Sequence, residues 1–191
     1  MSDKKYKEAY ISVDIEAAGP NPSQYSILSI GAWMVGNPQK TFYIELKPIH
    51  NRYTPEALEI NGFSLESLAE TGWEPGEAMR RFEGWIQAEI PSEYKPVFVA
   101  FNAPYDWMFI NDYFMRFLGR NPFGHTALDI KSYYMGFTGC SWQETTMRDI
   151  GPHYLENHQH THNALQDALD QGRIFEILLA KASGQPQGDQ L

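Results

Sequence analysis

Cysteine is almost absent from this 191-residue sequence, which contains only Cys140. One cysteine cannot form an internal disulfide, and it excludes a metal centre built from several thiolates. We interpret it as a half-buried small apolar residue in a loop. This usage is typical of a reducing compartment, so a cytoplasmic protein is expected.

Long apolar segments are absent as well. No stretch approaches the roughly 18 continuous apolar residues of a membrane span, and the opening MSDKKYKEAY is charged. The sequence therefore predicts no signal peptide and no membrane partner. Hydrophobic residues make up 42% of the chain, enough for one buried core, and no break in composition suggests a second. We expect a single domain over residues 1–182, followed by a disordered tail over 183–191.

Positive charge is scarce, because 15 Lys and Arg residues oppose 24 Asp and Glu residues for a net charge of −9. This balance disfavours a protein that coats long nucleic acid through a basic field. It does not exclude a phosphodiester substrate, since bound divalent cations would neutralise several carboxylates. A short oligonucleotide would also need only a few local cationic contacts.

The pattern of apolar residues predicts an α/β fold. Alternating or continuous apolar runs typical of strands lie near residues 8–14, 25–35, 40–46, 96–101 and 126–130. Helical spacing occupies residues 54–89, 102–118 and 161–182. The first three strands have short connections, which favours an antiparallel meander, and the later segments alternate between helix and strand. We therefore expect a mixed five-stranded sheet flanked by helices.

Two acidic residues end the first predicted strand, in the segment YISVDIEAAG. Asp14 and Glu16 are two positions apart, so a strand would present both carboxylates on one face. Such a pair repels itself unless a cation lies between the two groups, which makes a metal site one interpretation. A polar strand edge is the other, and the pair alone does not decide between them.

A third carboxylate, that of Asp106, follows the predicted strand at 96–101. Pro104 suits a first helical turn, which places Asp106 near the N-terminus of a helix. An acidic side chain there either stabilises the helix dipole or serves as a ligand.

His162 and Asp167 begin the last predicted helix, with Thr161 as the expected N-cap. Their spacing of five does not place them on one helical stripe, so it does not build a zinc pair of the i, i+4 type. We expect Asp167 to turn inward while His162 reaches over the substrate, because an imidazole that titrates near neutral pH can accept a proton from an attacking water. A small metal cluster of His158, His160 and His162 in a flexible loop is the alternative.

Together, the segments DIEAAG, NAPYD and HNALQD resemble the three exonuclease motifs of the DEDDh branch of the DnaQ-like 3′–5′ exonucleases, which have a ribonuclease H-like fold. The resemblance covers about residues 8–180, and the joint occurrence of the motifs in this order is far more specific than any one of them. It implies an enzyme that hydrolyses phosphodiester bonds at single-stranded DNA or RNA 3′ ends, or in short oligonucleotides, and releases nucleoside 5′-monophosphates. A homodimer is compatible with relatives of this size.

The same resemblance implies roles for individual residues. His162 would act as the general base. Two Mg²⁺ or Mn²⁺ ions, hard cations that prefer oxygen ligands, would be held by four carboxylates: Asp14, Glu16, Asp106 and Asp167. Six further positions are expected to contact the substrate: Ala17, Gly19, Leu58, Phe63, Asn102 and Trp107. For Leu58 and Phe63, which lie in YTPEALEINGFS, core packing is the alternative role.

Two other functions are compatible with these residues. A catalytically silent nucleic-acid-binding module on the same fold would be marked by the loss of one or more acids, and all of them are present. A hydrolase of small phosphodiesters would use the same carboxylates without a groove for nucleic acid.

Overall fold

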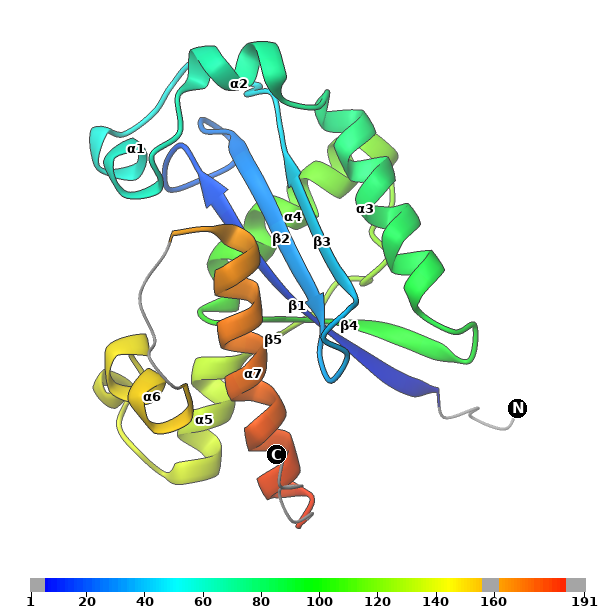
Figure 1. The fold of residues 1–191 in the computed structure, drawn as a ribbon, viewed down its shortest axis with the longest axis vertical. Helices are drawn as coiled ribbons and strands as arrows, with labels where there is room; N and C mark the ends of the chain where they lie inside the picture. Colours follow the sequence, from blue (N-terminus) through cyan, green and yellow to red (C-terminus); the bar gives the residue numbers. More distant parts are fainter. Residues whose placement is uncertain (1–5, 156–161, 185–191) are drawn as a thin grey trace.

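A mixed five-stranded sheet with helices on both faces forms the centre of the computed structural model, which describes residues 6–155 and 162–184 (Figure 1). The strands are β1 (Lys7–Ala17), β2 (Ile27–Met34), β3 (Thr41–Glu45), β4 (Tyr94–Ala100) and β5 (Ala127–Asp129). Their order across the sheet is β3-β2-β1-β4-β5. Strands β1, β2 and β3 form the expected antiparallel meander, whereas β4 and β5 run parallel to β1. The predicted fold class is therefore confirmed.

The helices begin at residues suited to that position. Thr54, Ser64 and Asn163 each accept a hydrogen bond from the first turn of the helix that follows, and so satisfy N–H groups that lack partners within the helix. The α-helices are α1 (Pro55–Asn61), α2 (Leu65–Thr71), α3 (Pro75–Glu89), α4 (Ala103–Leu118), α5 (Ile130–Thr138), α6 (Met147–Tyr154) and α7 (Ala164–Ala182). A short 3₁₀ turn, η1 (Trp142–Glu144), precedes α6.

Alternate residues of β1 face two different layers. Ile11, Val13 and Ile15 are buried in the larger core with the apolar faces of α3 and α4. Tyr10 packs on the opposite face, where it contacts Phe175 of α7. Because strand side chains alternate, the even-numbered positions of β1 all point toward the α7 face. This alternation decides the direction of the two acidic residues near the end of the strand.

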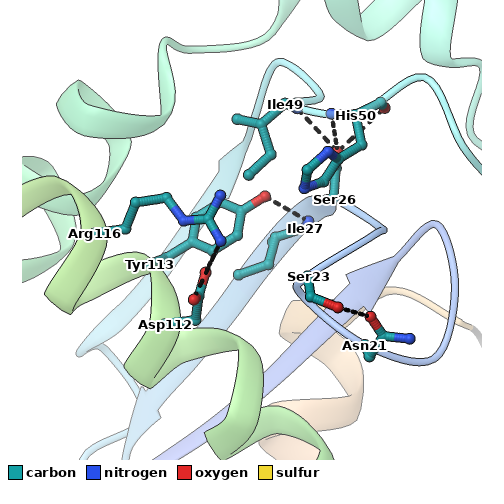
Figure 2. Close-up of polar contacts among 9 residues, drawn as sticks. All are labelled: Asn21, Ser23, Ser26, Ile27, Ile49, His50, Asp112, Tyr113 and Arg116. Atoms are coloured by element: carbon teal, nitrogen blue, oxygen red, sulfur yellow. Dashed lines mark hydrogen bonds and ion pairs between the residues drawn. The ribbon is translucent and has the colours of Figure 1, made fainter.

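The loops at the end of β1 are fixed by buried polar contacts (Figure 2). Ser26 Oγ accepts hydrogen bonds of 2.9 Å from the main-chain N–H groups of Ile49 and His50. From the other side, the hydroxyl of Tyr113 on α4 accepts a 2.9 Å hydrogen bond from the N–H of Ile27. The turn between β1 and β2 and the segment before α1 are thus held to each other and to α4.

Several boundaries differ from the sequence-based expectation. Strand β1 continues to Ala17, three residues further than expected, so Glu16 lies within the strand. The N-cap of α7 is Asn163, and Thr161, the expected cap, lies outside the described residues. Helices α5 and α6 were not expected from the sequence. The tail predicted for 183–191 lies outside the described residues from 185 onward, and none of the described helices is long and apolar enough to cross a membrane.

Candidate active site

The end of β1 presents Asp14 and Glu16 side by side on the face covered by α7. Asp14 pairs with Gly31 of β2, and Glu16 pairs with Ser29, so all four lie on the same face of the sheet. Both acidic side chains are half-buried. The strand therefore places its two carboxylates next to each other, as their spacing predicts.

Gly31 allows α7 to approach these carboxylates closely. A Cβ atom at this position would overlap the backbone of Ala164 and Leu165, in the first turn of α7. A side chain here would therefore separate the helix from the sheet, whereas glycine permits direct backbone contact beside Asp14. Asp167 lies in that same first turn.

The approach of α7 brings together three side chains from two distant parts of the chain. Glu16, His162 and Asp167 each offer one ligand atom, and these atoms all lie within 4.8 Å of one another. His162 directly precedes the N-cap and has a left-handed backbone, with φ 48°, while its side chain is exposed. An exposed imidazole at the rim and half-buried carboxylates below it can act on the same small ligand.

Asp106 reaches the site from the opposite layer. It lies in the first turn of α4, after Asn102, which has φ 66° and turns the chain sharply from β4 into the helix. The Asp106 side chain is 4% exposed, and its Oδ1 accepts a 3.1 Å hydrogen bond from the main-chain N–H of Ile15. Since Ile15 lies between Asp14 and Glu16, this bond fixes the third carboxylate against the strand that carries the first two.

The carboxylates raise one another's pKa values. Burial, followed by the charges of Asp106, Asp167 and Glu16, raises the pKa of Asp14 well above its usual range. Burial and the charge of Asp167 raise the pKa of Glu16 to about 8, although a hydrogen bond from Asn61 acts in the opposite direction. Repulsion among these carboxylates destabilises the folded protein unless bound protons or cations neutralise their charge.

Asp106 shows the same effect. Burial raises its pKa to about 8, against the lowering effect of the Ile15 N–H, and the charges of Glu16 and Asp129 add to the rise. A group of oxygen ligands with unbalanced negative charge is the donor set that hard divalent cations such as Mg²⁺ or Mn²⁺ prefer. The residues present therefore fit such ions.

The residues expected to contact substrate lie in different surroundings. Leu58 and Phe63 are half-buried and pack against a small cluster around Tyr25 and Leu68. Trp107 packs edge-on against Phe98, with ring centroids 5.2 Å apart, beside the larger core. Their roles toward a substrate stay predictions.

The remaining expected contacts lie close to the acidic residues. Ala17 is buried next to Glu16, and Asn102 is exposed at the start of α4. Gly19 is buried beneath the ring of Tyr25, which leaves no room for a Cβ atom, so packing already explains the glycine there. His158 and His160, which the alternative metal cluster requires, lie outside the described residues.

Sequence reasoning missed some neighbours of the carboxylates. The amide of Asn61 donates to the carbonyl of Ala17 at 3.3 Å, and the hydroxyl of Tyr105 donates to the carbonyl of Gly19 at 3.1 Å. Burial and the charges of Asp106, Glu16 and Asp14 raise the pKa of Tyr105, which keeps its proton available for donation. Its position directly before Asp106 was the one available signal. Gln171, buried in α7, had none.

Comparison with known sequences gives two related results. The model of the RNase T family, described as exonuclease, matches residues 11–175. The 3′-5′ DNA exonuclease Cap18 of Escherichia coli is 44% identical to this chain over 172 residues, which cover 90% of the chain and 92% of Cap18. All five motif residues lie inside the family match.

Solved structures with the same fold include other nucleases. The nuclease domain of 3′hExo, a DEDDh family member bound to rAMP, superposes with a TM-score of 0.77 at 14% identity, covering 98% of this chain and 99% of that one. Pop2p of S. pombe, in a Mg²⁺- and Mn²⁺-bound form, has a TM-score of 0.68 at 19% identity and covers 96% of this chain and 86% of its own. At these identities the likeness shows a shared fold.

Proposed function

Since this chain belongs to the DEDDh branch of the ribonuclease H-like 3′–5′ exonucleases, we propose that it shortens single-stranded nucleic acids from the 3′ end, one nucleotide at a time. The products are nucleoside 5′-monophosphates and a strand shorter by one residue. DNA is the favoured substrate, because the relative with 44% identity is named as a DNA exonuclease.

One observation carries the proposal: acidic side chains from β1, α4 and α7 converge, and an imidazole lies beside them. Glu16, His162 and Asp167 have ligand atoms within 4.8 Å of one another, and the charges of Asp106 and Asp167 act on Asp14. A catalytically silent module would gain nothing from this mutual repulsion. The arrangement supports an enzyme that depends on divalent cations.

In the proposed mechanism the carboxylates of Asp14, Glu16, Asp106 and Asp167 hold two divalent cations. When bound, such ions activate a water and stabilise the charge on the leaving oxygen. The hydrogen bond from the Ile15 N–H to Oδ1 of Asp106 would hold this carboxylate in place for ligand binding. Strand β1 would contribute two of the four ligands, Asp14 and Glu16.

His162 provides the base. Its exposed imidazole takes a proton from the attacking water, whose oxygen bonds to phosphorus as the bond between phosphorus and the 3′-oxygen breaks. The 3′-oxygen takes up a proton from solvent, so the shortened strand leaves with a 3′-hydroxyl group. Because His162 precedes the N-cap of α7, its position follows that of the helix.

Product analysis tests this function. The purified protein is incubated with 5′-labelled single-stranded and double-stranded DNA and RNA, each with Mg²⁺ or with Mn²⁺. We expect a ladder that shortens by one nucleotide from the 3′ end of single-stranded DNA, with 5′-monophosphates as the other product. The Asp14→Ala variant serves as the inactive control.

The alternatives give different results in the same experiment. A chromogenic phosphodiester hydrolysed faster than any oligonucleotide would indicate a small-phosphodiester hydrolase. Binding of oligonucleotides without cleavage would indicate a silent module, and cleavage at wild-type rate by Asp14→Ala would overturn the site. A cytoplasmic location and a homodimer stay predictions.

A further inference from the structure

Gln171 is a buried amide in the middle of α7, the helix that crosses the sheet (Figure 1). Its side chain is 1% exposed and makes two hydrogen bonds to the backbone of the sheet. The N–H of Phe101 donates to its Oε1 at 2.5 Å, and its Nε2 donates to the carbonyl of Val13 at 2.8 Å. The amide thus donates to β1 and accepts from the residue that directly follows β4.

These two backbone groups mark the point where the sheet opens. The parallel ladder between β1 and β4 ends with Ser12 paired to Val99. If the register continued by one residue, the carbonyl of Val13 would accept directly from the N–H of Phe101. Instead, the Gln171 amide bridges these two groups, since it accepts from the N–H of Phe101 and donates to the carbonyl of Val13.

The opening coincides with the carboxylates. Val13 precedes Asp14, and Phe101 precedes Asn102, where the chain turns into α4 and leads to Asp106. Gln171 itself is one helical turn after Asp167. A single side chain of α7 therefore bonds to β1 and to the segment that leads into α4. The next N–H on the open edge of β1, that of Ile15, goes to Asp106.

We propose that Gln171 is a positioning residue, whose amide sets the separation of Asp14, Asp106 and Asp167 and so the fit of the site to its divalent cations. This inference rests on the proposed function for its catalytic consequence. Without the amide, the Val13 and Phe101 groups either lose their partners or bond directly to each other. Direct bonding draws the start of α4 toward β1 and changes the distance between Asp106 and Asp14.

The test replaces Gln171 by Met, which has a similar volume and neither donates nor accepts strongly, and by Asn, which keeps the amide but is one methylene shorter. Phe175→Leu is the matched control, because Phe175 is fully buried one turn further along α7 and contacts Tyr10 and Tyr133 rather than the acids. Mn²⁺ affinity is measured by electron paramagnetic resonance. The parameters kcat and KM are measured at saturating Mn²⁺, at a temperature where each variant is folded by circular dichroism.

We expect both Gln171 variants to weaken Mn²⁺ binding by roughly 10- to 100-fold, as removal of groups that orient metal ligands does. They should also lower kcat by about 100-fold with little change in KM, because a displacement of about 1 Å at reacting groups is that costly. Phe175→Leu should lower the melting temperature while Mn²⁺ affinity and kcat stay at wild-type values. Gln171 variants that behave like Phe175→Leu would overturn the proposal.

A measurement on the wild-type protein tests the positioning role of Gln171 even if the Gln171 variants do not fold. In nuclear magnetic resonance spectra of the wild-type protein, the side-chain amide protons of Gln171 should exchange slowly with solvent, and their chemical shifts should change when Mg²⁺ is added. Rapid exchange and unchanged chemical shifts would contradict the positioning role of Gln171. The proposed function and the positioning role of Gln171 can also be disproved independently of each other. If the wild-type protein cleaves no nucleic acid but Gln171→Met weakens Mn²⁺ binding, the proposed function is wrong and the positioning role stands.

Discussion

The main-chain N–H of Ile15 donates a 3.1 Å hydrogen bond to Oδ1 of Asp106, 91 positions further along the chain. The bond joins the strand that carries Asp14 and Glu16 to the first turn of α4. It also occupies one oxygen of a carboxylate whose burial has already raised its pKa to about 8. The hydrogen bond therefore fixes Asp106 against the strand that carries Asp14 and Glu16, at a cost in electrostatic repulsion.

Replacing Asp14 by Asn should separate stability from activity. The change removes a carboxyl group whose pKa is raised by burial and by the charges of Asp106, Asp167 and Glu16. We therefore expect the melting temperature in EDTA to rise. Each kcal/mol of repulsion removed corresponds to roughly 2–4 °C in a chain of this size. Exonuclease activity should fall below detection. Melting curves and oligonucleotide digestion measure both effects, and a less stable variant would contradict the account.

Stability of the protein in EDTA should fall as the pH rises. Glu16 and Asp106 have folded-state pKa values of about 8, above those of carboxyl groups in an unfolded chain, near 4. The folded state therefore retains protons that the unfolded state releases, so these groups stabilise it fully below about pH 4, and this contribution is lost toward pH 8.

Urea denaturation at pH 5, 6, 7 and 8, with EDTA or with Mg²⁺, measures this effect. We expect the free energy of unfolding in EDTA to decrease across the series, and Mg²⁺ to restore more of it at pH 8 than at pH 5. Glu16→Gln and Asp106→Asn should each flatten the curve. If the stability of the wild-type protein in EDTA instead increased with pH relative to these variants, the pKa values of Glu16 and Asp106 would be lowered by folding and the account would be wrong.

Replacing His162 by Ala should leave a slow enzyme. Loss of a general base costs roughly 10²–10⁴-fold in rate, and the remaining activity should increase with pH as hydroxide becomes more abundant. Because the side chain is exposed, the melting temperature should change little. A pH–rate profile of both proteins measures the effect, and an unchanged kcat would remove His162 from the mechanism.

Two glycines offer a matched pair of substitutions. Gly31→Ala introduces a Cβ atom into the backbone of α7, so we expect a loss of about 1–3 kcal/mol in stability and a decrease of about 100-fold in kcat. Gly84 lies in α3 with no atom within 4 Å of an added Cβ. Gly84→Ala should stabilise the protein by up to about 1 kcal/mol through helix propensity, with unchanged kcat. Equal effects at the two positions would contradict the close approach at Gly31.

Much of the fold could be predicted from the sequence, because it depends on local patterns. The alternation in β1 predicts that Asp14 and Glu16 share a face, and Pro104 predicts that Asp106 lies in a first helical turn. The order of motifs then identified the residues that the structure brings together. Their roles as ligands and base stay predictions.

The parts that could not be predicted depend on contacts between distant residues. Nothing in the sequence marks Gln171 as the buried amide that bridges Val13 and Phe101, since polar residues on a helix are most often exposed. The covering of Gly19 by Tyr25 is likewise a matter of packing, which a glycine in a turn-rich segment does not reveal. Helices α5 and α6 are short, and the segment between them, 139–146, contains only a three-residue 3₁₀ turn.

Helix α7 comes after every strand of the sheet in the chain. It carries Asp167, and His162 directly precedes its N-cap. During translation, the polypeptide up to α6 therefore emerges without Asp167 and without His162. Under the proposed mechanism, the complete site forms only when α7 has been synthesised and has packed against Gly31. Under the proposed mechanism, translation products that stop before α7 lack His162 and Asp167 and should therefore be inactive.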